Sequence, residues 1–543
     1  MPLRPADRSE TTMVTPSVGI PAQPAASPPA GRVIHHRPGA PTGTSHAANA
    51  PGTTTDEATR YLCAAVHLDS RLAEKLVEDV LEEPLRAVVR SPGVDLVAVM
   101  KHAIAARARH LTRDAALAAL LILAVVSFLT IGSLAGVVVV VASWAVVVAE
   151  AYVARWGALA QTLRRGTFDA SRAPDPQWQV TRDQIALVAT YAAGNVSTYS
   201  GFDPFLGHGW TLDSWSFALD TTVPCDEQPV VSFTASELRG RLTSRIALLD
   251  LPGLGVHDRL FINGADIHHD SRFLTGRNPR PVDRVSDAVL AYLTEHPEDR
   301  ARPYLVVEIV GWGGQLVYSL FLRVTVGSSH LFVEVNHSLL PPLHWRYYEI
   351  DDLLLRPTFG ELTRLVVASG FRWFGLMFRC IPRTLKQIFA SLRRRWKQAR
   401  QRRMIAKRFT FNHGALLSIR QEASDLRSRV PDRFPSLGPV LDPMLSPVIR
   451  TVLRLGLDSN GLLIGYHRYF QKLDQEMYTK VVEKRIFDTL VDFLEEKNID
   501  PAELKRRAET IVNNSLTVGA GATVTGSAFS VGRGASATSN GKP

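Results

Sequence analysis

A loop rich in aromatic residues, glycine and proline is the first part of the sequence that could do chemistry. It runs from Tyr199 to Trp210. The side chains in it that could line a site are Tyr199, Ser200, Phe202, Asp203, His208 and Trp210. Loops of this kind often carry binding and catalytic groups, but the same glycines would suit a tight turn with positive φ angles. The pattern therefore predicts either a structural turn, which we favour, or the site of an enzyme.

Histidine and aspartate gather further along, at His257-Asp258 and at His268-His269-Asp270. Zinc and iron accept imidazole and carboxylate ligands, but adjacent residues of a strand point to opposite faces. The sequence has no G-x-S-x-G, Walker A, H-E-x-x-H or G-x-G-x-x-G motif. We therefore expect no metal and no cofactor, and an enzyme is the less favoured hypothesis.

A strongly basic segment is the second candidate. The 543-residue chain has 62 Lys and Arg against 52 Asp and Glu, a formal net charge of +10. Between Glu361 and Glu422 there are 15 basic residues and no acidic one. The densest group comprises Arg393, Arg394, Arg395, Lys397, Arg400, Arg402, Arg403, Lys407 and Arg408.

Apolar and aromatic residues precede this basic group, between Trp373 and Phe389. The combination predicts an interfacial helix followed by a polybasic segment that contacts anionic lipid headgroups. A solvated or protein-facing charged surface is the alternative. The same charges would neutralise phosphates, but no RRM or helix-turn-helix motif accompanies them, so nucleic acid is the least favoured partner.

A long apolar run in the sequence indicates that these elements belong to a membrane protein. Residues 115–149 contain no charge and lie between Asp114 and Glu150. One helix of this length would measure about 52 Å, whereas the hydrocarbon core of a bilayer is about 30 Å thick. Because Gly132 and Ser133 stand at the centre, we predict a transmembrane hairpin of two short helices over residues 114–153. One long tilted helix and an apolar hairpin inside a soluble core are the alternatives.

Basic residues flank the run on both sides. Lys101, Arg107, Arg109 and Arg113 precede it, and Arg155, Arg164 and Arg165 follow it. The positive-inside rule places both flanks in the cytoplasm, which requires an even number of crossings. We therefore expect a multi-pass protein of the cell membrane whose N- and C-terminal regions are cytoplasmic.

The rest of the chain divides by composition, and the fold class that we predict is α+β. The expected segments are a disordered Pro/Ala-rich region (1–55), a cytoplasmic helical segment (56–113), the hairpin (114–153), a cytoplasmic α+β domain with an antiparallel sheet (154–360), a basic amphipathic helical segment (361–412), a mostly helical C-terminal region (413–514) and a Gly-rich flexible tail (515–543).

The clearest strand pattern lies between Tyr304 and His337. Residues 315–326, QLVYSLFLRVTV, alternate between apolar and other positions. Glycine clusters separate this run from YLVVEIV before it and LFVEVNH after it, which predicts a three-stranded antiparallel meander. QPVVSFTA, upstream, also has the pattern of a strand.

Several segments resemble a group of uncharacterised membrane proteins of high-GC bacteria. They are YSGFDPFLGHG from Tyr199, HDRLFINGADI from His257 with Arg272-Phe273-Leu274, and FLEEKNIDPAELKRRAETIVNNS before the Gly-rich tail. The resemblance implies a transmembrane pair with a large cytoplasmic region. It implies no activity and no catalytic residue.

Together these patterns predict a membrane-anchored cytoplasmic protein that acts as a binding or scaffolding module. Its partners would be the lipid bilayer, anionic lipid headgroups and a protein. A membrane-tethered enzyme with a site near Tyr199–Trp210 is the alternative, and a tethered nucleic-acid binder using Arg393–Arg408 is a further one.

Overall fold

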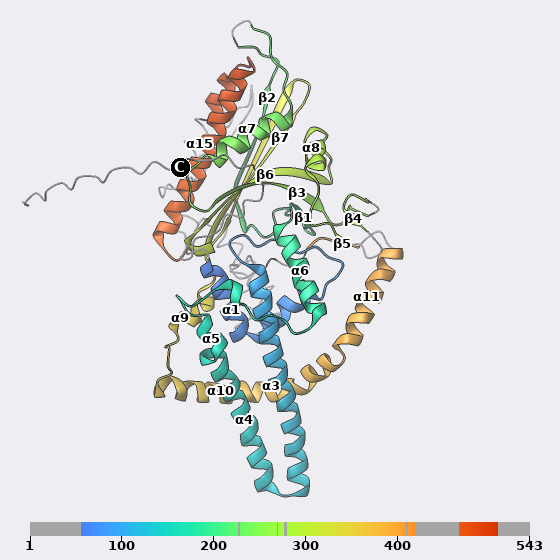
Figure 1. Ribbon diagram of the computed structural model, residues 1–543, viewed down its shortest axis with the longest axis vertical. Helices are drawn as coiled ribbons and strands as arrows, with labels where there is room; N and C mark the ends of the chain where they lie inside the picture. The colour runs from blue at the N-terminus through green and yellow to red at the C-terminus, as the bar shows by residue number, and fades with distance from the viewer. Residues whose placement is uncertain are drawn as a thin grey trace, which may run out of the picture. The chain divides into compact units, whose positions relative to one another are not determined.

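The structure is a computed structural model (Figure 1). It describes residues 56–225, 228–268, 270–275, 280–407, 411–415, 418 and 466–508. The predictions for residues 1–55 and 515–543, and most of the prediction for 413–514, lie outside these ranges.

Helices dominate the first part of the chain. They are α1 (Glu57–Leu68), α2 (Ser70–Leu76), the π-helix η2 (Val77–Leu81), α3 (Leu96–Thr130), α4 (Ser133–Trp156), α5 (Ala158–Thr162), the short 3-10 helix η3 (Ala170–Arg172) and α6 (Gln179–Ala193).

Strands and helices then alternate. The order is β1 (Val196–Tyr199), β2 (Trp210–Asp220), α7 (Ala235–Ala247), β3 (Leu254–Asn263), β4 (Leu274–Thr275), β5 (Arg280–Pro281), α8 (Asp287–Glu295), β6 (Ala301–Gly311), η4 (Trp312–Gly314), β7 (Leu316–Val326) and β8 (His330–Leu340). The elements that follow are η5 (Trp345–Tyr348), α9 (Glu349–Asp352), α10 (Phe359–Ile388), α11 (Ala390–Lys407) and α15 (Tyr469–Glu496).

Six strands form one mixed sheet in the order β1-β3-β6-β7-β8-β2. The β6-β7-β8 meander confirms the strand pattern of the sequence. The expectation of a wholly antiparallel sheet is wrong for β1, which pairs parallel with β3. The expected strand QPVVSFTA is also absent from the described residues, because residues 228–234 pair with no strand there.

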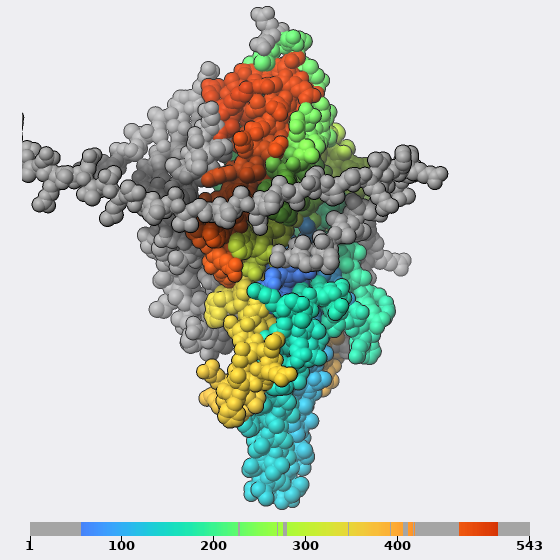
Figure 2. Space-filling view, turned by 60° about the vertical axis from the view of Figure 1, so that its left-hand side comes forward, coloured from blue at the N-terminus to red at the C-terminus, as the bar shows by residue number. Residues whose placement is uncertain are grey.

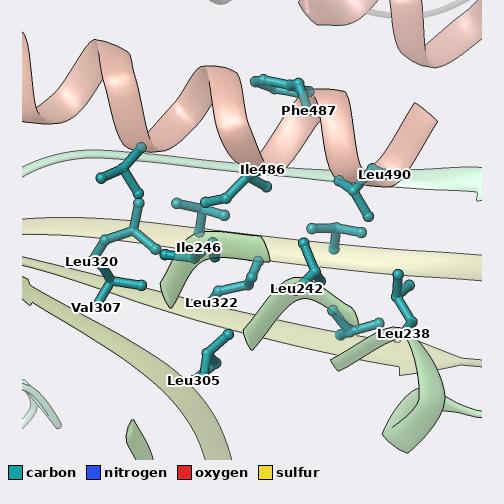
Figure 3. Packing of buried hydrophobic residues seen from close by; sticks show 14 of the residues in the cluster. Leu238, Leu242, Ile246, Leu305, Val307, Leu320, Leu322, Ile486, Phe487 and Leu490 are labelled. Atoms are coloured by element: carbon teal, nitrogen blue, oxygen red, sulfur yellow. The ribbon is translucent and has the colours of Figure 1, made fainter. Parts of the chain in front are cut away.

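Helices α7 and α15 cover one face of this sheet, as Figure 3 shows. Alternate residues of β6 and β7, such as Leu305, Val307, Leu320 and Leu322, point into this core. From α7 and α15 the core receives Leu238, Leu242, Ile246, Ile486, Phe487 and Leu490. Period two in the strands and period 3.6 in the helices bring these side chains together.

A second core joins the amino-terminal helices. It includes Leu62, Val66, Leu76, Val99 and Met100, from α1, α2 and α3. Asp95 caps α3 by accepting hydrogen bonds from the amides of Val97 and Ala98, which fixes where this long helix begins.

Helices α3 and α4 pack side by side and are joined by Ile131 and Gly132 (Figure 1). Helix α10 runs across both of them, and α11 then turns away from the direction of α10. Three stretches are long and apolar enough to cross a membrane: Leu96–Thr130, Ser133–Thr162 and Phe359–Ile388. Since α10 crosses α3 and α4 rather than running along them, the three cannot all span one bilayer in this arrangement.

Candidate functional site

The loop from Tyr199 to Trp210 is built as a turn against the sheet. Gly207 and Gly209 have φ angles of 99° and 93°. A Cβ atom on Gly209 would lie 2.0 Å from the carbonyl oxygen of Leu339. These glycines are therefore required by close backbone contact, whatever else the loop does.

The candidate residues of this loop do not converge on one point. Phe202 is fully exposed and Trp210 is 40% exposed. Asp203 accepts a hydrogen bond from the Phe205 amide at 2.8 Å, and Ser200 donates to the carbonyl of Ala415 at 2.6 Å. These polar groups stabilise the backbone, which favours the structural interpretation.

His208 is the exception, because it belongs to a buried polar network. Its Nδ1 lies 3.0 Å from the Ser319 hydroxyl and 3.7 Å from Glu308 Oε1. Arg90 donates to the same oxygen of Glu308 at 2.5 Å, and His257 lies 3.7 Å from it. We call Arg90, His208, His257, Glu308 and Ser319 the buried network.

The electrostatics of the buried network favour a fixed ion pair. Burial lowers the pKa of His208 to about 3 and that of His257 to about 4, so both rings are neutral at pH 7. Burial alone would raise the pKa of Glu308, but the positive charge of Arg90 outweighs burial and lowers that pKa to about 2. Glu308 is therefore ionised and held by Arg90.

The geometry does not match a catalytic triad. A Ser-His-acid relay uses the two opposite ring nitrogens, whereas Ser319 and Glu308 both approach Nδ1 of His208. The Ser319 side chain is also completely buried. The buried network thus links the segment around Arg90 to β3, β6 and β7. Sequence reasoning missed it, although Glu308 is a lone charge inside an apolar strand.

A second buried polar group, also missed, fixes α15 to the other face of the sheet. The Tyr318 hydroxyl lies 2.7 Å from His337 Nδ1, and His337 Nε2 lies 3.2 Å from Glu483. Trp215 donates to the same carboxylate at 3.1 Å. Helix α15 covers these side chains, so they position the helix rather than receive a ligand.

The candidate metal ligands do not form a site in the described part of the chain. Asp270 pairs with Arg272 at 2.8 Å, and His269 lies outside the described residues. Within those residues, no group of three or more His, Cys, Asp or Glu could hold a metal ion.

The ends of α3 and α4 carry a large exposed apolar surface. We call residues 115–149 the apolar arm. Its turn is the most exposed part: Leu129 is 81%, Ile131 75% and Leu134 79% accessible. Figure 2 shows these cyan helix ends without other described segments around them. Soluble monomers rarely expose a contiguous apolar patch of this extent.

Helix α10 adds a second apolar surface at the base of the arm. Its exposed apolar residues recur at steps of three and four: Val367, Phe371, Phe374, Phe378, Ile381, Leu385 and Ile388. This spacing puts them on one face, which we call the α10 stripe. Arg364, Arg379 and Lys386 fall on another side of the helix at the same period.

The opposite face of α10 packs on the arm. Trp373 donates to the Ser143 hydroxyl at 2.8 Å, and Cys380 is buried with Leu117 and Val147. The α10 stripe is therefore left facing away from the protein.

Ion pairs mark the boundary between the arm and the rest of the chain. Arg113 pairs with Asp114 at 2.7 Å and with Glu150 at 3.3 Å. Arg109 contacts Glu150 at 3.4 Å, and Arg383 of α10 contacts Asp114 at 3.5 Å. Arg113, Asp114 and Glu150 are almost fully buried where the uncharged run begins and ends. Together these ion pairs fix α3, α4 and α10 to one another.

Part of the predicted basic surface is already neutralised within the protein. Arg393 lies 3.6 Å from Glu78, Arg394 lies 3.3 Å from Glu82, and Lys397 pairs with Glu83. The exposed residues Arg395, Arg402 and Arg403 form no ion pair with the described residues. Arg400 lies over the ring of Trp396 at 5.7 Å. Lys407 ends α11, and Arg408 lies outside the described residues. The contact of this group with lipid stays a prediction.

Two cavities in the described part have volumes of about 40 and 30 Å³. A site for a small organic ligand usually needs several hundred Å³. Neither cavity is lined by the loop from Tyr199 to Trp210. The enzyme alternative therefore gains no support from the described residues.

Comparison with known proteins identifies a family. A family model described as an AbeC-like domain, a family of uncharacterised function, matches residues 214–527. The match includes most of the sheet, α7, α10, α11 and α15, and it excludes the apolar arm. No curated protein and no solved structure matches the chain.

Proposed function

The chain belongs to the AbeC-like domain family, and from this premise we propose that it is a membrane-anchored binding or scaffolding protein. The apolar arm enters the bilayer as a hairpin, and α10 lies at the lipid surface. The AbeC-like domain is thereby held next to the membrane and is available to a protein partner.

The observation that carries this proposal is the way α10 crosses the arm. The helix meets α3 and α4 next to the ion pairs of Arg113, Asp114 and Glu150, where the uncharged run begins and ends. A helix with an exposed apolar stripe at that level is suited to the interface, where the stripe, directed away from the arm, would contact the surrounding lipid at the headgroup and acyl boundary. Its exposed basic residues, Arg364 and Arg379, would remain among the headgroups.

The arrangement also supports a topology in which both flanks of the arm lie on the cytoplasmic side of the membrane. Because α3 and α4 join at a short turn, the segments before and after the arm lie on the same side of any bilayer that the arm enters. Basic residues such as Lys101 and Arg165 flank both ends. The positive-inside rule assigns that side to the cytoplasm, and the basic face of α10 would then contact anionic lipid.

Membrane fractionation with a matched pair of substitutions tests the proposal. Ile122 in the middle of the arm and Leu248 at the end of α7 are 60% and 71% exposed. We expect Ile122→Asp to lower the membrane-bound fraction of the full chain strongly, because a charge in the hydrocarbon is costly. Leu248→Asp should leave it unchanged. Equal membrane binding by both variants, or a wild-type chain that stays in the soluble fraction, would refute membrane anchoring by the arm.

A further inference from the structure

The position of α10 limits how much of the arm can enter a bilayer. Helix α10 packs against Leu117 of α3 and Val147 of α4. The stretch from Leu117 to Thr130, and likewise that from Ser133 to Val147, is about 20 Å long at 1.5 Å per residue. The hydrocarbon core of an ordinary bilayer is about 30 Å thick. With α10 at one surface, the arm ends about 10 Å short of the other surface.

The arm cannot compensate by sinking deeper. Arg113, Asp114 and Glu150 form buried ion pairs at its base. Lys386 of α10 pairs with Glu74 at 2.6 Å and with Glu78 at 2.9 Å. Moving the arm inward would drag these charges into hydrocarbon, which is strongly unfavourable.

The turn of the arm is poorly suited to remain inside the hydrocarbon. The amides of Ile131 and Gly132 both donate to the carbonyl of Ser127 at 3.0 Å. No described side chain caps the start of α4, so the first amides of that helix and the last carbonyls of α3 depend on water. A backbone group that has no hydrogen-bond partner in hydrocarbon is unfavourable in free energy. Its cost equals that of a hydrophobic mismatch of several ångströms between the protein and the bilayer.

Building on the membrane anchoring proposed above, we propose that the apolar arm crosses a bilayer that is locally thinner than usual. The turn reaches the polar layer on the far side because the hydrocarbon core around the arm is thinner than in an ordinary bilayer. The protein then prefers bilayers of short acyl chains, in addition to the anionic headgroups that its basic residues would contact.

Labelling of the turn in vesicles of different thickness tests this inference. The full chain would carry Ser133→Cys in a background in which Cys63, Cys225 and Cys380 are replaced by Ala. Vesicles of phosphatidylcholine with phosphatidylglycerol would carry myristoleoyl, oleoyl or erucoyl chains. A membrane-impermeant maleimide would be placed on the side opposite the AbeC-like domain. Gln177→Cys, exposed on the domain side, is the control that should stay unlabelled.

We expect Ser133→Cys to react in myristoleoyl vesicles and its labelled fraction to fall about tenfold in erucoyl vesicles. Equal labelling in all three would overturn the inference, as would no labelling even in the thinnest bilayer, which would place the turn inside the hydrocarbon. In both cases the chain would still float with vesicles, so membrane anchoring would stand. A chain that floats with none of the vesicles would refute the anchoring itself.

A lengthened arm provides a second, independent test. Inserting four apolar residues after Ala124 and four after Val140 extends each helix by about 6 Å. The labelling of the turn should then persist in vesicles with longer chains than the original arm tolerates. An unchanged dependence on chain length would contradict the role that we assign to arm length.

Discussion

Helices α10 and α15 have nearly the same length, 30 and 28 residues, and both carry apolar residues at helical spacing. Helix α15 buries Val482, Ile486 and Leu490 completely against the sheet. Helix α10 leaves Phe371 80% and Phe378 71% exposed. This difference shows that an apolar helix face must pack against another apolar surface, but the face alone does not indicate whether that surface is protein or lipid. In α15 the partner is the sheet, and for α10 we propose that it is lipid.

Truncation of a buried leucine should have the largest effect on the free energy of unfolding and should distinguish α15 from α10. We expect Leu490→Ala on α15 to lower the free energy of unfolding by about 2–5 kcal/mol, since it removes contacts in a closed core. Urea unfolding of the full chain in mild detergent measures this change.

Leu385→Ala on α10 is the matched control, because Leu385 is 48% exposed. It should change the free energy of unfolding by less than about 0.5 kcal/mol. Similar losses for both variants would mean that the α10 stripe has a partner within the protein.

Acid should destabilise the face of the sheet opposite α15. His208 is neutral in the folded protein because burial lowers its pKa to about 3, whereas an unfolded histidine takes up a proton below about pH 6.5. The unfolded state therefore binds more protons between these two values, so stability falls as the pH decreases through this window. Glu308, with its pKa lowered to about 2, adds a loss below about pH 4.5.

We expect His208 to account for about 3 kcal/mol of the stability that the chain loses between pH 7 and pH 4. His257, whose pKa is lowered to about 4, adds a loss of its own in the same window. In His208→Gln, which keeps a polar group near Ser319, the total loss should be smaller by the share of His208. Urea midpoints measured across this range test the prediction, and an equal pH dependence of the variant would show that His208 is not responsible.

A single aromatic residue of the α10 stripe should matter for membrane binding rather than for folding. Phe378→Ser should weaken binding to vesicles by about 1.5–3 kcal/mol, which is the value of burying a phenylalanine in an apolar environment. Flotation measures the bound fraction. Phe202→Ser, at an even more exposed site in the loop next to the sheet, should bind like the wild type.

Charge on α11 should have the smallest and most graded effect. Helix α11 turns away from the direction of α10 (Figure 1), and Arg402 lies seven residues beyond Arg395, or about 10 Å along the helix. Arg395→Gln should weaken binding to anionic vesicles about fivefold, equivalent to about 1 kcal/mol. Arg402→Gln should have less than half of this effect in free energy, because screening limits the attraction to about 8–10 Å. Equal effects would indicate that all of α11 lies on the lipid surface.

Sequence patterns predicted the parts of the fold that depend on neighbouring residues. Alternation in residues 315–326 predicted β7, and Gly132 and Ser133 marked the break between α3 and α4. The two short helices expected over residues 114–153 belong to longer helices of 35 and 24 residues. Sequence patterns failed where contacts between residues far apart in the sequence determine the structure. Glu308 is a lone carboxylate in an apolar strand, and the sequence could not show that it pairs with Arg90, because the two residues lie 218 positions apart. The expected strand QPVVSFTA pairs with no strand among the described residues, although the amide of Val231 donates to the carbonyl of Lys497.

The candidate site shows the same limit. The apolar and aromatic residues between Trp373 and Phe389, followed by the basic group, predicted an interfacial helix, but they could not show that α10 crosses the arm. The basic residues of α11 have the charge that the sequence indicates. Their pairing with Glu78, Glu82 and Glu83 could not be predicted, because those acidic residues lie more than 300 positions earlier in the chain.

Quenching by brominated lipids along α10 tests the central claim most directly. A fluorescent probe would be attached in turn to single cysteines at positions 374 to 381 of the full chain, bound to vesicles. The account predicts strong quenching at Phe374, Phe378 and Ile381 and weak quenching at Arg379, with the period of a helix. Weak quenching at every position, equal to that of a probe at Leu248, would contradict contact between α10 and lipid.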